Sequence, residues 1–530
     1  MNLRRGGHPP PSLQRLLPLP STVRPALRLL VAFCVSGAVG CRAEGVATLP
    51  RPALLHRPVP AAPAVTAAQS RLWVALAAHL GGPGELRLRS AGAPLRLRDA
   101  SGFSEQATAF SLRWRRQPLA QPLLVRRLVL GPFASYESAE AMARRWQAAG
   151  AAPVVARPRD WEVWAAPGSP APAGEAPRLL ERRDTQAWVP VLPLSTGSRA
   201  LKGPIRIEAP AGLRWNGGVF AGPFLLQADA HGGWTLIEQV PLERYLQGVV
   251  PHEIGAGAPP AALAAQAVLA RTWALRNQQR FAVDGYHLCA DTQCQVYGDP
   301  RQAGAAVGRA IAATAGRVLV WRDQPIHAVY HASNGGVSAG FEEVWAGSPL
   351  PYLQADLDGP AQRLAPLALT LPLDASELDR LLRAASGGHG ADHPRFRWQR
   401  LLDAATLTQA ARTVDPRFGQ VNGVTVSERG PSGRVLALEL RGTPAGSRVV
   451  LRRDAIRRRL RQLPSTLFVV ASAGPGLWRF EGGGFGHGAG LSQAGAIDLA
   501  RQGWSLERIL ARYYPGTQLL PLSALSESAP

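Results

Sequence analysis

The stretch that constrains the fold most is residues 240–280, VPLERYLQGVVPHEIGAGAPPAALAAQAVLARTWALRNQQR. Its second half predicts a helix. Pro259 and Pro260 stand where a first helical turn tolerates missing N–H groups, and the alanine, leucine and glutamine residues that follow propagate a helix well. A turn rich in glycine and proline precedes this helix and holds one carboxylate, Glu253. The sequence therefore predicts an acidic side chain carried directly in front of a helix.

Two interpretations of Glu253 follow from its neighbours. It lies between Val249, Val250, Pro251 and Ile254, which predicts partial desolvation. Desolvation raises a carboxyl pKa, and a glutamic acid that keeps its proton at neutral pH can act as a general acid. The alternative is that Glu253 only places a charge at a helix start, where acidic residues are favoured. Taken alone, the segment favours this second interpretation.

Breaks in the sequence pattern predict that the chain is divided into several domains and linkers. Stretches rich in proline, alanine and glycine separate segments with strand-like alternation from segments with helical periodicity. Because both kinds of segment occur together, we expect a multi-domain α+β fold with antiparallel strands. The predicted parts are a signal peptide (1–41), a disordered linker (42–69), an α+β region (70–167), a second linker (168–204), a core with the Glu253 turn (205–360), a second α+β subdomain or insertion (361–470), a C-terminal core block (471–518) and a tail (519–530).

The first 41 residues are typical of an export signal. Arginines precede an apolar run at residues 29–39, which is too short to span a bilayer and fits the apolar core of a signal peptide. The run ends in a small residue followed by Cys41, which resembles a bacterial lipoprotein site, although Ala38 stands where leucine is usual. Lipidation of Cys41 and ordinary cleavage are the two alternatives. We expect an exported protein of the periplasm or cell envelope that contacts the membrane only through such a lipid.

The charge of the chain indicates the kind of partner. Its 59 basic and 37 acidic residues give a net charge of +22, which favours nucleic acid, membrane headgroups or an acidic polymer. The sequence contains no basic run interleaved with aromatic residues, no zinc-finger spacing and no RNA-recognition signature, so nucleic acid is disfavoured. A wall polymer with free carboxyl groups fits this charge.

Residues 128–166 are predicted to form a compact strand–helix–strand module. A strand ends at a Gly-Pro-Phe turn, Ser135 or Ser138 caps a helix, Gly150 ends it, and a second strand begins near Pro153. This order resembles half of a SPOR domain, a family that binds peptidoglycan glycan strands without stem peptides. The alternative is a generic strand–helix–strand unit within an α+β domain.

The cysteine pair of the chain body, Cys289 and Cys294, has two interpretations. With His287 it gives the spacing His-x-Cys-x4-Cys, which fits a zinc site whose fourth ligand is open or comes from His327 or His331. The alternative is a short-loop disulfide, which an oxidising envelope favours.

The C-terminal block carries His487 in a glycine loop that runs into Leu491-Ser492-Gln493 and a helix. Its spacing matches neither a P-loop nor a dinucleotide fingerprint. Bare glycine backbone around a histidine would let a polysaccharide approach closely. The alternative is a structural turn with a surface histidine, and the loop by itself favours that alternative.

Four ordered blocks resemble those of the SpoIID/LytB family. They are YLQGVVPHEI with AAQAVLARTWA, then DTQCQVYGD, then VYHASNGGVSAGFEEVWAGSPLPYL, and then GGGFGHGAGLSQAGAIDLARQGWSLERILARYYPGT. The blocks lie within residues 240–518, about half of the chain. The family contains SpoIID, a lytic transglycosylase that cuts denuded glycan strands of peptidoglycan, and LytB, an enhancer of a cell-wall amidase. The resemblance therefore implies a SpoIID-like core that acts on the cell wall.

The resemblance also implies roles for particular residues. The catalytic acid falls on Glu253 and an arginine needed for activity falls on Arg271. It favours the zinc interpretation of the cysteine pair, with a structural ion, because the acid mechanism needs no cofactor. Two departures stand out: Ala264 occupies a usual lysine position, and Asn334 a position where many relatives carry serine or cysteine. Polar residues of the glycan cleft fall on Gln295, Tyr330, Ser333, Asn334, His487, Ser492 and Gln493.

The expected reaction needs one acid. Glycoside hydrolases usually use two carboxylates, and no second acid stands near Glu253 in its block. A lytic transglycosylase uses one glutamate to protonate the bond between MurNAc and GlcNAc and then to accept the proton of the muramic C6 hydroxyl, which leaves a 1,6-anhydro end. The alternative is a non-catalytic wall-binding protein that enhances an amidase.

Overall fold

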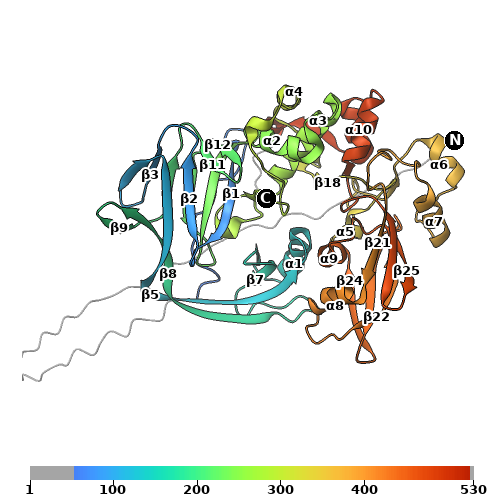
Figure 1. Cartoon of the computed structure of the whole chain (residues 1–530), viewed down its shortest axis with the longest axis horizontal. Coiled ribbons are helices and arrows are strands. Elements are labelled where there is room, and N and C mark those ends of the chain that lie inside the picture. The colour runs from blue at the N-terminus through green and yellow to red at the C-terminus, as the bar shows by residue number, and fades with distance from the viewer. Residues whose placement is uncertain (1–52, 526–530) are drawn as a thin grey trace, which may run out of the picture. The chain divides into compact units, whose positions relative to one another are not determined.

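The computed structural model describes residues 53–525 (Figure 1). The predicted signal peptide and Cys41 lie outside this range. The fold is α+β, as predicted, with antiparallel sheets and short helices. Among the described residues, no helix combines the length and the apolar character that crossing a membrane requires.

Two large sheets build the first half of the described chain, and strands from distant segments alternate in both. Because the first sheet pairs β1 with β14 and the second pairs β2 with β11, the predicted region 70–167 and the predicted core from 205 onward are one structure. The first sheet has the order β15 (Leu288–Cys289), β1 (Arg71–Leu80), β14 (Trp234–Pro241), β13 (Phe224–Ala228), β10 (Ile205–Glu208), β3 (Leu95–Arg98) and β4 (Ser104–Ala107). The second has the order β12 (Gly218–Phe220), β11 (Leu213–Trp215), β2 (Glu85–Ser90), β5 (Ala109–Phe133), β7 (Trp161–Ala165) and β6 (Val154–Ala156).

Both predicted linkers are wrong where the structure describes them. The segment 168–204 contains β8 (Arg178–Leu194), which pairs with β5, and β9 (Gly197–Ala200), which pairs with β8. Residues 53–69 also pack on the domain, since Leu54 forms a bridge with Val125 in β5. Proline-rich composition suggested disorder, but these pairings bury the segments against distant strands.

The strand–helix–strand unit predicted at 128–166 is present. Helix α1 (Tyr136–Ala148) begins after Ser135, whose side chain accepts the Ser138 N–H, and Gly150 follows its end with a φ of 96°. The strands that flank it along the chain are β5 and β6, and β7 lies between them in the eight-stranded sheet. The likeness of this unit to a SPOR domain remains a prediction.

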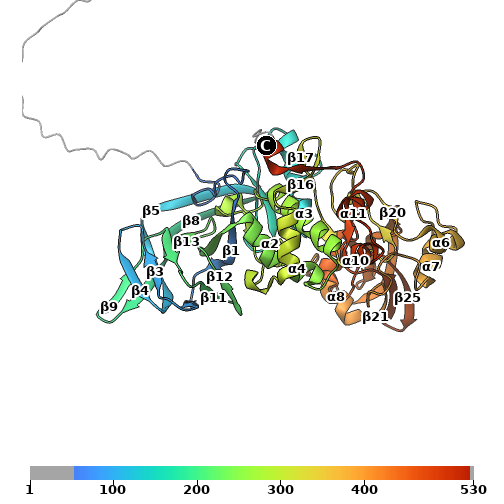
Figure 2. The same cartoon turned by 90° about the horizontal axis from the view of Figure 1, so that it is seen from above.

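The predicted helix after Glu253 is α3 (Pro260–Arg276), and it is buried on nearly every side. It packs against α2 (Leu242–Val250), α4 (Ala305–Ala313), α10 (Gln493–Arg501) and α11 (Leu506–Tyr513), several of which surround it in Figure 2. Strand β16 (Arg317–Trp321) also contacts α3 and pairs with β28 (Gln518–Pro521). The start of the predicted tail therefore belongs to the core.

The C-terminal half contains a second apolar core. A hairpin that turns at Pro431-Ser432-Gly433 joins β22 (Val421–Arg429) to β23 (Val435–Gly442), which also pairs with β24 (Ser447–Arg452). A second small sheet joins residues from both sides of the predicted boundary at 470, so this subdomain extends further than predicted. That sheet has the order β21 (Arg397–Asp403), β26 (Leu477–Gly483) and β25 (Phe468–Gly474), and the helices of the region are α7 (Ala375–Arg383), α8 (Ala404–Arg412) and α9 (Asp454–Arg459).

Candidate functional site

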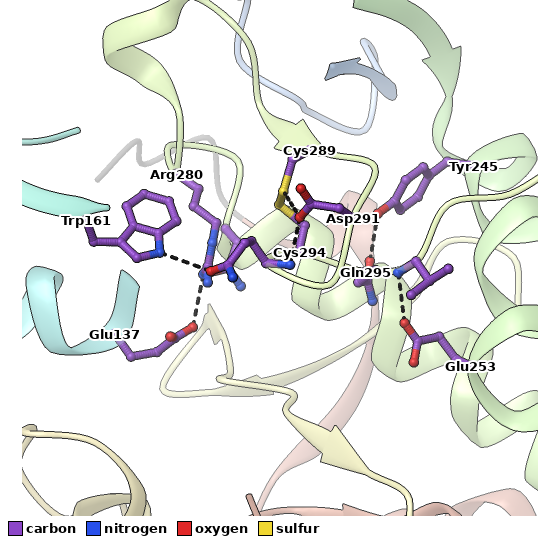
Figure 3. Close-up of a disulfide and its surroundings, with 12 residues drawn as sticks. Glu137, Trp161, Tyr245, Glu253, Arg280, Cys289, Asp291, Cys294 and Gln295 are labelled. Atoms are coloured by element: carbon purple, nitrogen blue, oxygen red, sulfur yellow. Dashed lines mark hydrogen bonds and ion pairs between the residues drawn. A yellow bond between two sulfur atoms is a disulfide. The ribbon is translucent and has the colours of Figure 1, made fainter. Parts of the chain in front are cut away.

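The turn that carries Glu253 joins α2 to α3. Residues Pro251–Gly255 form a single π-helical turn, a rare geometry that is frequent at functional sites. The Glu253 side chain is half-buried, and its Oε1 accepts the Val296 N–H at 3.0 Å (Figure 3). Burial raises the pKa of the Glu253 carboxyl above its usual value, and the Val296 N–H opposes that rise. The predicted desolvation of this carboxyl is therefore confirmed.

The loop that supplies Val296 lies tightly against α2 because two glycines meet there. The Gly298 N–H donates to the carbonyl of Gly248 at 2.9 Å. A Cβ on Gly248 would clash with the ring of Tyr297, and a Cβ on Gly298 would clash with the ring of His252. Glycine at both positions thus permits the close approach that brings the Val296 N–H to Glu253.

A chain of side-chain hydrogen bonds runs beside Glu253. The Tyr245 hydroxyl donates to Gln295 Oε1 at 3.0 Å, and Gln295 Nε2 donates to the Tyr330 hydroxyl at 2.8 Å. Burial, and then the nearby Glu253 charge, raise the pKa of both tyrosines. The structure therefore brings Glu253, Gln295 and Tyr330 together, as predicted (Figure 3 shows Tyr245, Gln295 and Glu253).

His487 is a neighbour of this network rather than a surface residue. Its Nε2 donates to the Tyr330 carbonyl at 2.8 Å while its Nδ1 accepts the Ala489 N–H at 3.2 Å. Burial lowers the pKa of His487 to about 3, so the ring is neutral at neutral pH. Its role in this arrangement is to hold the backbone of Tyr330, not to transfer a proton.

The Ser333-Asn334 turn is held by internal bonds. Asn334 is fully buried; its side chain donates to Asp358 Oδ2 at 2.6 Å and accepts the Gly336 N–H at 2.9 Å. Ser333 is also buried, and its backbone pairs with that of Phe485. Both residues shape the turn from inside, which does not fit the glycan contact that the resemblance implied for them.

Ser492 and Gln493 begin α10 and are buried as well. The Ser492 hydroxyl accepts the Gly495 N–H at 3.2 Å and caps the helix. Gln493 Nε2 donates to Gln266 Oε1 on α3 at 3.2 Å. These bonds tie α10 to the helix that follows Glu253 and give both side chains a structural role.

Arg271 does not reach Glu253. It is fully buried on α3, where Nε and Nη2 donate to the two carboxylate oxygens of Glu243 at 2.8 and 2.7 Å and Nη1 donates to the Arg317 carbonyl. Glu243 stands at the start of α2 and Glu253 ten positions later, roughly 15 Å along a helix at 1.5 Å per residue. Arg271 is therefore a buried partner of Glu243, and the part in activity that the resemblance implied for it stays a prediction.

The cysteine pair does not fit the predicted zinc site. Cys289 and Cys294 form a disulfide (Figure 3), so their sulfurs are bonded to each other. His287 is buried; its Nδ1 accepts the Trp73 N–H and its Nε2 donates to the Pro63 carbonyl, both at 2.9 Å. Within residues 53–525, no cluster of three His, Cys, Asp or Glu side chains is arranged to hold a metal ion. The disulfide alternative holds.

Replacing both cysteines of the disulfide by serine is expected to lower the free energy of unfolding by about 2 kcal/mol, because the bond closes a loop of six residues in the unfolded chain. Thermal unfolding of the variant and the wild type, each with and without a dithiol reductant, measures this. Reductant should lower the wild-type midpoint to that of the variant and leave the variant unchanged. Equal midpoints for wild type and variant without reductant would contradict the bond.

Sequence reasoning missed two groups at the site. The Val296 N–H is a backbone donor, so no residue type signals it. Tyr245 carries a weak signal: it precedes Glu253 by eight residues, about two helical turns, which places both on one side of the segment.

Comparisons with known proteins match two parts of the chain. Residues 230–321 match the family model described as stage II sporulation protein, and residues 339–490 match a domain of unknown function, DUF8618. The first match contains the Glu253 turn, α3, the disulfide and Gln295.

The chain is also similar to curated proteins of bacilli. It is 27% identical over 300 residues to stage II sporulation protein D of Bacillus subtilis, which covers 53% of this chain and 75% of that protein. It is 28% identical over 309 residues to the protein of the same name from Bacillus amyloliquefaciens, with 53% and 75% covered. It is 29% identical over 291 residues to an amidase enhancer of Bacillus subtilis, with 52% of this chain but only 40% of that protein covered.

Proposed function

This chain is a SpoIID/LytB-family protein through the domain that holds Glu253, and from that premise we propose that it is a lytic transglycosylase. Its substrate is the MurNAc–GlcNAc bond of peptidoglycan glycan strands, with denuded strands as the preferred form. The observation that carries the proposal is the Glu253 carboxyl, half-buried, with a raised pKa and one oxygen held by the Val296 N–H.

The geometry suits an acid that later acts as a base. Because Oε1 of Glu253 accepts a backbone hydrogen bond, the proton of the neutral acid belongs on Oε2, for which the structure gives no protein partner among residues 53–525. Oε2 gives this proton to the bridging oxygen as the bond from the muramic C1 to that oxygen breaks. The C6 hydroxyl oxygen of the same sugar then bonds to C1, and its proton returns to Glu253. No water is consumed.

The surroundings of Glu253 favour this reaction over hydrolysis. Within the described chain, burial and the Val296 N–H account for the shifted pKa of Glu253, and no charged side chain contributes. Hydrolases that work by two carboxylates place them roughly 5–9.5 Å apart, where a second charge would act on the first. An intramolecular nucleophile needs positioning rather than a second acid. In this proposal the half-buried Tyr330 contacts the sugar, and the buried Gln295 orients Tyr330 through their hydrogen bond.

The proposal includes export to the cell envelope, where an oxidising environment supports the Cys289–Cys294 disulfide. Lipidation of Cys41 remains part of the same proposal. The positive net charge of +22 suits a wall polymer that carries carboxylates.

A second candidate function is enhancement of a cell-wall amidase without catalysis. The likeness to an amidase enhancer favours it, as does the finding that Arg271 makes a structural ion pair rather than a contact to Glu253. In that case the site around Glu253 would bind glycan strands and deliver an amidase to them.

Mass analysis of products from stem-peptide-free glycan strands separates the two functions. The transglycosylase produces fragments with 1,6-anhydro-muramyl ends, each lighter by one water than a hydrolysis product. Intact strands after incubation with folded protein, together with a faster reaction of an added amidase, would support the enhancer instead.

The pH dependence of cleavage should report the Glu253 proton. Since burial raises the pKa of Glu253, the protonated acid persists to a higher pH than for an exposed glutamate, and kcat/KM should fall as pH rises through this raised pKa. Initial rates on denuded strands across pH 4–9 measure it. A profile whose only ionisation lies at the ordinary value of an exposed carboxyl would contradict the role of burial.

A further inference from the structure

A cavity of about 200 Å³ lies close to the Glu253 turn, where the β11–β12 hairpin faces residues 297–302. His252, the direct neighbour of Glu253, and Tyr297, the direct neighbour of Val296, both line it. Pockets for drug-sized ligands occupy roughly 300–1,000 Å³, so this cavity suits one small ring or side group. None of the roles assigned above uses it.

The walls combine aromatic rings with neutral polar groups. Trp215, Phe220 and Tyr297 form the aromatic part, and the amides of Asn216 and Gln302 lie at the same cavity. Flat apolar faces next to amide donors and acceptors suit a ligand with an apolar ring face and polar edges.

The indole N–H of Trp215 is a hydrogen-bond donor without an acceptor among the described residues. Its indole Nε1 is buried from solvent, and it has no hydrogen-bond acceptor in the part of the chain that the structure describes. Leaving a buried donor unpaired costs free energy, and such groups usually have a partner. Because Nε1 is closed to solvent while the cavity has room for a small ligand, this donor does not face the cavity, and Trp215 contributes its ring to the wall.

The frame of the cavity is rigid. Asn216 and Gly217 both have positive φ, 44° and 80°, and form the tight turn of the hairpin. The Val219 N–H donates to Asp299 Oδ2 at 3.0 Å, which fixes the hairpin to the loop that follows Gly298. Preorganisation of this kind reduces the entropy that a ligand must lose on binding.

The charge of the cavity favours a neutral ligand. Among residues 53–525, Asp299 is the one carboxylate of its lining; it is paired with Arg301 at 2.6 Å, and that arginine holds the pKa of Asp299 below its usual value. No lysine or arginine of this described range lines the cavity. An anionic peptide or phosphate would therefore find no free cation, although the whole chain is strongly basic.

We propose that this cavity is a subsite for one N-acetylated sugar residue, with the ring of Trp215 stacked on the apolar face of the sugar and the amides of Asn216 and Gln302 bonding to its polar edges. The subsite rests on the proposed function for its assignment to a glycan strand. It would hold a sugar next to the bond at Glu253 and so set the register of the strand.

Binding of β-1,4-linked N-acetylglucosamine tetrasaccharide, measured by calorimetry with the wild-type chain and with its Glu253→Gln variant, tests this. Trp215→Phe keeps an aromatic face, so it should bind within about twofold of the wild type. Trp215→Ala removes the ring and should weaken binding roughly two- to tenfold, the value of one aromatic contact. Gln302→Ala, at an exposed position, should weaken it without affecting the fold. Because the ligand is neutral, affinity should not change with salt.

Trp504→Ala, at a half-buried tryptophan that follows α10 in the sequence, is the matched control and should bind as the wild type does. Unchanged affinity in folded Trp215→Ala would overturn the subsite. If the wild type cleaves strands while Trp215→Ala binds normally, only the subsite fails. If the wild type never cleaves but the Trp215 effect is present, the subsite stands and the transglycosylase proposal fails.

Discussion

Replacing Glu253 by glutamine is expected to slow glycan cleavage by about 10²–10⁴-fold, the usual contribution of a positioned general acid. Glutamine keeps the size of the side chain and can still accept the Val296 N–H, but it has no proton to give to the bridging oxygen. Binding of denuded strands should stay within about twofold. Single-turnover cleavage and equilibrium binding of the same strands measure both quantities.

Stability provides an independent readout of the Glu253→Gln variant. Burial raises the pKa of Glu253 in the folded state, so the protonated form stabilises the fold at low pH and this contribution is lost as pH rises through the raised pKa. Glutamine removes the cost of the buried charge, and the variant should unfold at a higher temperature than the wild type at pH 7. Glu208→Gln, at an exposed position, is the control and should change neither cleavage nor stability. Full cleavage by Glu253→Gln would exclude the proposed acid.

Removing the carboxylate of Glu243 is expected to destabilise the fold by about 3–5 kcal/mol, because it leaves the fully buried Arg271 guanidinium without its counter-charge. Glu243 itself is 40% exposed, so the reverse change, Arg271→Met, should cost less. Chemical denaturation of Glu243→Ala and Arg271→Met measures the two values.

The double variant Glu243→Leu/Arg271→Met separates a structural role of Arg271 from a catalytic one. Replacing both members of a buried pair with apolar groups is often neutral, so the double variant should recover most of the lost stability, and a double-mutant cycle should show coupling. Per folded molecule it should cleave strands like the wild type. A stable double variant with the activity of Glu253→Gln would restore the role in catalysis that the family resemblance implied for Arg271.

Local features of the sequence predicted what depends on neighbours along the chain. Prolines followed by alanines started α3 where predicted, Ser135 capped α1, and the apolar residues around Glu253 led to a desolvated carboxyl. The starts of α3 and α1 depend on residues within one helical turn, so the sequence pattern and its physical cause lie in the same stretch. For Glu253 the apolar neighbours gave the correct direction, and the distant loop of Val296 also lies against the carboxyl.

The tertiary structure alone determined which residues far apart in the sequence form bonds, ion pairs or strand pairs with one another. The spacing of Cys289 and Cys294 suits zinc or a disulfide equally, and the choice depended on His287, whose ring nitrogens are taken by the backbone of residues more than 200 positions away. The sequence alone did not indicate that Arg271 pairs with Glu243, which precedes it by 28 positions. The proline-rich segment 168–204 became strand because β5 offered it an unpaired edge. Local propensity determines which elements can form, but a hydrogen bond or ion pair also requires a partner, and the fold supplies that partner.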